Sequence, residues 1–285
     1  MWTMRGDIVL FLAEPGVRAF RQGIQCAILN PERFRGLLTR MELKKIASML
    51  LPSRLRAALH RLRTRLFDIY ATKSYSQEGE DMILQRIFAG KEHGFYVDVG
   101  AHHPRRFSNT YFFYRKGWSG INIEPSPEAV RAFQSDRKRD TNLQCGISDR
   151  AGNLTYYSFD EPALNTFDEG LAQSRVASTP YKLIGTTPIP VERLESILRK
   201  HVPADRPIDF LSVDAEGLDF PVLQSNDWSR YRPRCVLVEA LGCSLEGAMQ
   251  GELYRFMTSQ GYELIAKTFN TLIFCEKEAI AALNN

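Results

Sequence analysis

The sequence has few cysteines and no long apolar run. Among its 285 residues are five cysteines, an odd number, and no two of them form a Cys-x-x-Cys pair. This pattern argues against a disulfide framework and a structural zinc site, and it fits a reducing cytosol best. The longest apolar run near the start, from Ile8 to Ala13, is six residues, whereas a membrane span needs about 18. We therefore expect a cytoplasmic protein with neither an export signal nor a transmembrane anchor.

The composition is otherwise that of an ordinary globular protein. Hydrophobic residues make up 44% of the chain and charged residues 25%, which excludes the disordered and fibrous classes. A chain of this length can bury a substantial core, and its length favours one or two domains.

Positive charge is concentrated at the amino-terminal end. Residues 1–73 hold 14 Lys or Arg against 5 Asp or Glu, and the rest of the chain carries a net negative charge. Between Leu55 and Leu66, leucines recur at spacings of four, three and four with arginines around them, which predicts a basic amphipathic helix. Two interpretations stay open: a helix packed on the main domain, or a surface that meets anionic lipid headgroups or a polyanionic substrate. We divide the chain into a basic helical extension, residues 1–72, and a main domain, residues 73–285.

The main domain alternates predicted helices and strands. The predicted strands are residues 95–99, 120–124, 142–145, 155–159, 208–213 and 235–240, and a final pair covers 262–267 and 271–276. The predicted helices are residues 76–89, 125–135, 191–201, 218–224 and 247–260. Continuous apolar strands indicate a parallel sheet covered on both faces, and the final pair indicates an antiparallel hairpin. The fold class is therefore α/β, and the long segment from Asp160 to Gly185 is a candidate lid or substrate loop.

Acidic residues stand at the ends of several predicted strands. Asp98 lies near the end of the first strand and Glu124 closes the second, while Asp149 and Asp214 follow later strands. In an open α/β sheet, ligands bind outside the carboxyl ends of the strands. We expect these carboxylates to face one rim of the sheet and the chemistry to lie there.

The spacing of Glu124 indicates an adenosine cofactor. It comes 24 residues after Gly100, about the spacing at which an acidic side chain accepts hydrogen bonds from ribose hydroxyls. The loop after the first strand has only this one glycine and carries Asp98, which would repel a pyrophosphate but attract the ammonium and sulfonium groups of S-adenosylmethionine. The balance favours the methyl donor over a dinucleotide. The alternative for Asp98 is an ordinary aspartate that caps a turn.

Several separate blocks of sequence occur in an order typical of one family. They are residues 75–81, 95–104, 106–110, 117–123 and 212–219. With these blocks, the stretch from about Tyr75 to Gly242 resembles the FkbM-type S-adenosylmethionine-dependent methyltransferases. The resemblance implies the class I methyltransferase fold, a Rossmann-like seven-stranded sheet that ends in an antiparallel hairpin. It also implies O-methylation, commonly of a sugar hydroxyl in a polysaccharide, glycolipid or natural product.

The resemblance implies roles for particular residues as well. The loop at the methionine end of the cofactor would be formed by Asp98, Gly100, Ala101 and His102, the ribose clamp by Glu124, and the adenine edge by Ile147, Ser148 and Asp149. The sequence departs from the family pattern at two places. His103 and Pro104 replace a glycine-rich continuation of the loop, and Glu124 stands where relatives often carry Asp.

A base would assist methyl transfer, because a sugar hydroxyl is a poor nucleophile at neutral pH. We expect Asp214 or Glu216 to accept the proton or orient the sugar, with His103 as the rival base. The alternative for Glu216 is a turn at the start of a helix, where acidic residues complement the helix dipole. Together with Asp219, these two carboxylates could suit Mg²⁺, but the spacing is not diagnostic and we expect no metal.

Two other classes of function compete with this interpretation. An NAD-dependent oxidoreductase or sugar-nucleotide enzyme would need a glycine-rich pyrophosphate loop, which is missing. A non-catalytic nucleic-acid or membrane-binding protein is suggested by the basic extension, but RNA binding favours aromatic residues and residues 41–66 contain none. We expect a glycan or small-molecule hydroxyl acceptor and no nucleic acid, and peripheral membrane contact through the extension stays open.

Overall fold

The structure is a computed structural model that describes residues 57, 61 and 70–277. Contacts within the chain separate Met1–Thr72 from Lys73–Asn285, and only the second unit is described below. The predicted basic helix and nearly all of the predicted extension lie outside the described residues, so both stay predictions. Within the described part of the chain, no helix is long and apolar enough to cross a membrane.

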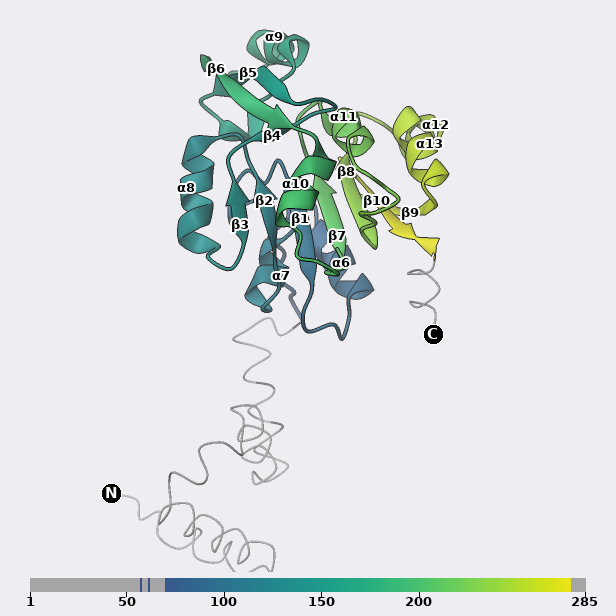
Figure 1. Ribbon diagram of the computed structural model, residues 1–285. Coiled ribbons are helices and arrows are strands. Elements are labelled where there is room, and N and C mark those ends of the chain that lie inside the picture. Colours follow the sequence, from purple (N-terminus) through teal and green to yellow (C-terminus); the bar gives the residue numbers. More distant parts are fainter. Residues whose placement is uncertain (1–56, 58–60, 62–69, 278–285) are drawn as a thin grey trace, which may run out of the picture. The chain divides into compact units, whose positions relative to one another are not determined.

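A seven-stranded sheet forms the centre of the unit (Figure 1). Its strands are β1 (Phe95–Val99), β2 (Ser119–Ile123), β3 (Thr141–Leu143), β7 (Phe210–Val213), β8 (Cys235–Glu239), β9 (Tyr262–Lys267) and β10 (Thr271–Glu276). Their spatial order is β3-β2-β1-β7-β8-β10-β9. The first five are parallel, and β10 is antiparallel to both β8 and β9. This topology confirms the predicted α/β fold with its closing antiparallel hairpin.

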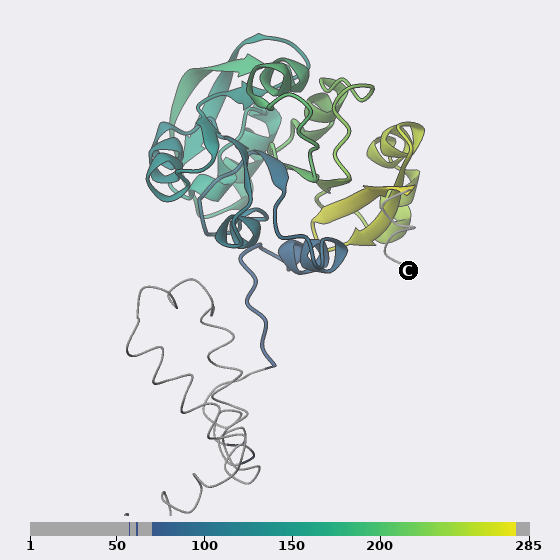
Figure 2. The same ribbon diagram turned by 60° about the horizontal axis from the view of Figure 1, so that its bottom comes forward.

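Helices cover both faces of this sheet, because the buried strands present apolar side chains on both sides. On one face, Tyr96 packs with residues of α6 (Glu80–Ile87) and α7 (Tyr111–Arg115), and Figure 2 shows these two helices together. On the other face, Val97 and Val99 pack with residues of α10, α11 and α13. The remaining helices of the described chain have these bounds: α8 Pro127–Asp136, α9 Glu169–Ser178, α10 Leu194–His201, α11 Asp219–Gln224, α12 Leu245–Gln250 and α13 Glu252–Ser259.

A second, three-stranded sheet lies over one end of the main sheet, at the top of Figure 1. It consists of β4 (Gly146–Ile147), β5 (Gly152–Phe159) and β6 (Leu183–Glu192), in the order β4-β6-β5. Between β5 and β6 the chain forms a short 3₁₀ helix, η1 (Pro162–Leu164), and then α9. The segment predicted as a candidate lid or substrate loop therefore contains regular structure, with α9 capped by Asp168, whose side chain accepts a hydrogen bond from the N–H of Leu171.

Most predicted boundaries agree with the structure to within a few residues, and two differences have clear causes. The predicted helix 247–260 is broken at Gly251, where an extended backbone separates α12 from α13. The predicted helix 76–89 begins later, at Glu80, because Asp81 binds the preceding turn. The Asp81 carboxylate accepts hydrogen bonds from the hydroxyl of Ser76 and the N–H of Tyr75.

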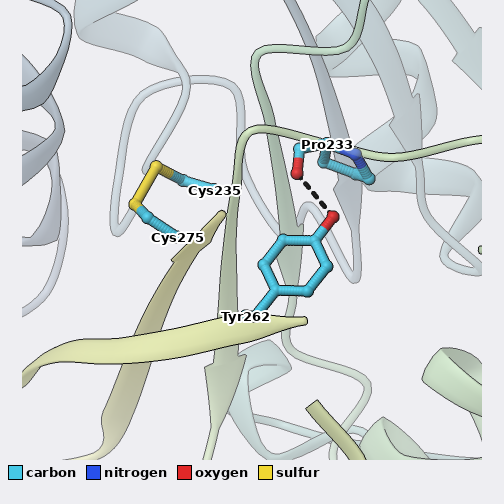
Figure 3. The surroundings of a disulfide bond; sticks show 4 residues. All are labelled: Pro233, Cys235, Tyr262 and Cys275. Atoms are coloured by element: carbon cyan, nitrogen blue, oxygen red, sulfur yellow. Dashed lines mark hydrogen bonds between the residues drawn. A yellow bond between two sulfur atoms is a disulfide. The ribbon is translucent and has the colours of Figure 1, made fainter. Parts of the chain in front are cut away.

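The cysteine prediction needs a correction, because Cys235 and Cys275 form a disulfide bond (Figure 3). The two residues are direct partners in the antiparallel pairing of β8 with β10, and their Cα atoms are 4.2 Å apart. They are 40 positions apart in the sequence, so the strand pairing alone brings them together. The cysteine pattern therefore no longer supports a reducing compartment, and the cytoplasmic location stays a prediction.

Candidate active site

A cavity of about 370 Å³ lies where the carboxyl ends of β1, β2, β7 and β8 meet the second sheet. This volume falls within the usual range for small-molecule and cofactor sites. Eight of the eleven candidate residues line it: Asp98, Gly100, Ala101, His102, Glu124, Ile147, Asp214 and Glu216. The other three, His103, Ser148 and Asp149, do not line it. The rim expected from the strand ends is therefore a real cavity.

The loop after β1 passes very close to the loop after β7. The N–H of Asp214 donates to the carbonyl of Val99 at 3.0 Å, and Gly100 adopts a φ of +73°. A Cβ on Gly100 would lie 1.7 Å from the carbonyl oxygen of Asp214. Only glycine fits this position, because the backbone is left-handed there and because a Cβ would collide with the Asp214 carbonyl. This close approach places Asp98 and Asp214 on the same cavity.

Asp98 is a buried carboxylate on the cavity wall, with 5% of its surface exposed. Its Oδ2 accepts a hydrogen bond from the hydroxyl of Thr110 at 3.0 Å. Burial raises the pKa of Asp98 to about 6, against the effect of the Thr110 hydrogen bond and the charge of Arg137. Asp98 is thus more than a turn cap, because its partner lies on a different segment of the chain.

Glu124 binds the backbone of two loops at the cavity. Its Oε2 accepts the N–H of His102 at 2.8 Å and its Oε1 accepts the N–H of Ser126 at 2.8 Å. Burial raises the pKa of Glu124 to about 7, although both hydrogen bonds lower it. An ionised carboxylate offers about four lone-pair sites, so further hydroxyl donors can still bind. Glu124 therefore ties the loop that carries His102 to the segment that follows β2.

The predicted adenine edge is only partly at the cavity. Ile147 lines it together with Tyr156, which lies in β5 of the second sheet, and Phe167, which lies in the segment between η1 and α9. Ser148 is buried, and its hydroxyl binds the exposed Asp149 carboxylate at 3.1 Å. The wall nearest Ile147 is therefore apolar and aromatic, and Asp149 lies outside it.

The two histidines of the first loop differ in their surroundings. His102 lines the cavity, and burial lowers its pKa to about 4, so its ring is neutral at pH 7. His103 is exposed and off the cavity, and its Nδ1 accepts the backbone N–H groups of Arg105 and Arg106, each at 3.0 Å. In this geometry His103 is poorly placed to act as a base in the cavity.

Asp214 and Glu239 form an acidic end of the cavity. Neither carboxylate has a hydrogen-bond partner among the described residues, and Oδ1 of Asp214 is buried without one. Burial and neighbouring carboxylates raise the pKa of both, that of Glu239 to about 8. Oxygens of these two residues and of Asp219 lie within 4.8 Å of one another. Both oxygens of Asp219 already accept backbone N–H groups, from Ala215 and Gly217.

Glu216 has a different environment, because it is tied to the segment that covers the cavity. Its carboxylate pairs with Arg175 of α9, and its backbone carbonyl accepts the hydroxyl of Thr166 at 2.6 Å. Arg175 also donates to the carbonyl of Leu164 at 2.8 Å. Glu216 therefore links the loop after β7 to the segment predicted as a lid.

Sequence reasoning missed several residues that line the cavity. They are Gln77, Asn109, Tyr156, Phe167, Arg175, Glu239 and Asn270. Glu239 could have been found, because it is the next-to-last residue of the predicted strand 235–240 and the strand-end argument applies to it as it does to Glu124. The others come from loops, from α9 and from the second sheet, for which the sequence carried no comparable signal.

Comparisons with known proteins identify the family. Residues 98–264 match the Methyltransferase FkbM domain, which is more than half of the chain. No curated protein matches the sequence. Among solved structures, a TehB-like SAM-dependent methyltransferase from Corynebacterium glutamicum aligns at 11% identity and a TM-score of 0.35, over 79% of this chain and 100% of its own. A methyltransferase from Geobacter sulfurreducens aligns at 12% identity and a TM-score of 0.33, over 84% of this chain and 98% of its own.

The matched region contains most of the strands and loops that build the cavity, from Asp98 in β1 into β9, the first strand of the closing hairpin. The cavity size, the buried Asp98 and the free acceptor sites on Glu124 all fit an adenosine cofactor with a cationic end. The chain belongs to the FkbM methyltransferase family, and S-adenosylmethionine is its methyl donor.

Proposed function

We propose that this enzyme methylates a hydroxyl group of a sugar in a polysaccharide, glycolipid or natural product. The observation that carries the proposal is the acidic end of the cavity, where Asp214 and Glu239 have no hydrogen-bond partner among the described residues. Unpartnered carboxylates suit an acceptor that donates several hydroxyl groups. The family supports the methyl transfer, and the sugar is our inference from this lining.

The cofactor half of the cavity is assigned as follows. Asp98 and the loop of Gly100, Ala101 and His102 would hold the methionine end, because a carboxylate attracts an ammonium group. Glu124 would accept hydrogen bonds from the ribose, and Ile147 would contact the adenine. Bound there, S-adenosylmethionine supplies a methyl carbon activated by its sulfonium. We keep Ser148 and Asp149 as outer residues of the adenine edge.

Asp214 is our choice for the general base. It lies beside Gly100 and therefore beside the cofactor loop, and it lacks the cationic partner that Glu216 has in Arg175. Burial and nearby carboxylates raise the pKa of Asp214 well above the usual range of an aspartate, and a raised pKa strengthens a carboxylate as a proton acceptor. Glu216 would orient the acceptor and hold the covering segment in place. His103 becomes the weakest of the three candidates.

The charge of the lining supports a neutral sugar. Of the described residues that line the cavity, Arg175 alone has a side chain of the Lys or Arg type, and this side chain is paired with Glu216. A phosphate or uronate in this cavity would meet carboxylates without a free cation. Amide side chains on the wall, from Gln77, Asn109 and Asn270, offer both donors and acceptors to hydroxyls.

The proposal is tested by methyl transfer to an immobilised panel of neutral, amino and acidic glycans, with radiolabelled S-adenosylmethionine. We expect label on neutral glycans. Asp214→Asn should lower turnover by about 10²- to 10⁴-fold while S-adenosylhomocysteine still binds, and Asp227→Asn, an exposed carboxylate outside the cavity, serves as the control. Near-normal turnover in both Asp214→Asn and Glu216→Gln, or label on acidic glycans alone, would count against the proposal.

We keep the expectation that no metal takes part. Asp219 is occupied by two backbone N–H groups, which leaves two unpartnered carboxylates rather than three. Treatment with EDTA should therefore leave methyl transfer unchanged, and loss of activity that Mg²⁺ restores would refute this expectation.

A further inference from the structure

A fully buried arginine lies behind the cofactor loop. Arg137, at the end of α8, has no exposed surface. Its Nε donates to the Asp140 carboxylate at 2.9 Å, one Nη to the carbonyl of Pro104 at 2.9 Å, and the other to the hydroxyl of Tyr96 at 2.8 Å. Removing a guanidinium from water is unfavourable unless its donors are paired, and here the pairing extends to the loop that follows Gly100.

One further bond of Arg137 reaches toward the cofactor side. Its Nη2 also donates to the hydroxyl oxygen of Thr110 at 2.9 Å, and the Thr110 hydroxyl donates to Oδ2 of Asp98 at 3.0 Å. A hydroxyl has one proton, so a Thr110 oxygen that accepts from Arg137 has its proton free for Asp98. The direction of the chain from Arg137 through Thr110 to Asp98 is thereby fixed.

A second hydroxyl is arranged in the same way. A hydrogen bond from Ser212 of β7 lowers the pKa of Asp98, and the amide of Asn109 donates to the Ser212 oxygen at 3.0 Å. Asn109 and Thr110 are neighbours in the block 106–110, which the sequence left without a role. This block therefore supplies a donor for Asp98 directly and orients another.

The charge around Asp98 makes these donors important. The charged or titratable groups that face it are Arg137, Asp140, Glu124, Asp214 and its strand neighbour Tyr96. Arg137 is the one cation of this set, and it acts on Asp98 across Thr110. Because burial favours the protonated form, the carboxylate depends on this support to stay charged.

We infer that Thr110 and Arg137 are positioning residues, which hold the Asp98 carboxylate charged and directed toward the ammonium group of the cofactor. The inference rests on the proposed role of Asp98 at the methionine end. A charged carboxylate binds an ammonium group much more strongly than a protonated one. Arg137 adds a second contribution, because its bond to Pro104 fixes the far end of the same loop.

Variants of Thr110 test the inference best, because replacing Arg137 would also leave the buried Asp140 carboxylate without its charged partner. Thr110→Val keeps the shape and removes the donor, and Thr110→Ser restores it. Thr258→Val, which removes a hydroxyl bound to the Tyr254 carbonyl in α13, is the matched control. Calorimetry of the full-length variants between pH 6 and pH 9 would use two probes, S-adenosylhomocysteine and 5′-methylthioadenosine, which lacks the amino-acid group.

Thr110→Val should weaken S-adenosylhomocysteine binding about tenfold at pH 7, the usual effect of losing a hydrogen bond to a charged group. The difference from the unmodified protein should shrink toward pH 9, where Asp98 ionises even without the donor. Binding of 5′-methylthioadenosine should not change, and Thr110→Ser should behave like the unmodified protein.

Two outcomes would overturn the inference: equal binding in Thr110→Val at every pH, or an equal, pH-independent loss for both probes, which would indicate a structural effect alone. A different result would show that the proposed cofactor site itself is wrong. If the unmodified protein bound neither probe, the assignment of the cavity would fall and the inference with it.

Discussion

Replacing Gly100 with alanine should separate the loops after β1 and β7. Gly100 has a φ of +73°, and a Cβ there would lie 1.7 Å from the carbonyl oxygen of Asp214. The left-handed backbone alone costs about 1–2 kcal/mol for a residue with a Cβ. The contact adds to this, because a backbone carbonyl must move by more than about 1 Å, and overpacking typically costs about 1–3 kcal/mol.

Gly90→Ala provides the matched control for this experiment. Gly90 has a similar φ of +81°, but an added Cβ would meet nothing within 4 Å. We therefore expect Gly90→Ala to lose only about 1–2 kcal/mol of unfolding free energy in urea denaturation. Gly100→Ala should lose about 2–5 kcal/mol and should bind S-adenosylhomocysteine at least about 100-fold more weakly, since misplacement by 1 Å has effects of that size. Equal stability and equal binding in the two variants would refute the reasoning.

Three further predictions concern pH, the disulfide and the membrane. Burial raises the pKa of Glu239 from 4.5 to about 8, so its contribution to stability is complete below pH 4.5 and disappears as the pH rises through 8. In that window the unfolding free energy of the ligand-free protein should fall by up to about 1.4 kcal/mol per pH unit from this group. Urea denaturation should find a flatter dependence of stability on pH in Glu239→Gln. The disulfide closes a loop of 40 residues and should stabilise the protein by about 4 kcal/mol. Dithiothreitol should therefore lower the denaturation midpoint of the unmodified protein but not that of the double variant Cys235→Ala, Cys275→Ala. An equal response of the two proteins would contradict the disulfide. If the basic extension binds membranes, anionic liposomes should float the full chain but not residues 73–285, and equal flotation of the two would remove this proposal.

The sequence predicted those parts of the site that depend on local pattern. Asp98 lies near the end of an apolar run that forms a strand, and Glu124 and Asp214 directly follow two others; parallel strands bring their carboxyl ends to one rim. Glu239 obeys the same rule and was overlooked. The hairpin of β9 and β10 was predicted at the residues where it occurs, since a turn separates two strongly apolar runs.

The remaining parts depend on contacts between distant segments. Tyr156 and Arg175 reach the cavity only because β5 pairs with β6 and folds the intervening residues over the main sheet. The pairing of Cys235 with Cys275 depends on the register of two strands. Likewise, the pairing of Glu216 with Arg175, on which our choice of Asp214 over Glu216 as the proposed base depends, appears only when α9 is in place.

The central claim is that the cavity holds the adenosine cofactor with Glu124 as the ribose clamp. Calorimetric titration of the purified protein with S-adenosylhomocysteine, with NAD as the control, tests it most directly. We expect saturable binding of S-adenosylhomocysteine at one site, no binding of NAD, and an affinity lower by about tenfold or more in Glu124→Ala. Unchanged affinity in Glu124→Ala, or binding of NAD in place of S-adenosylhomocysteine, would contradict it.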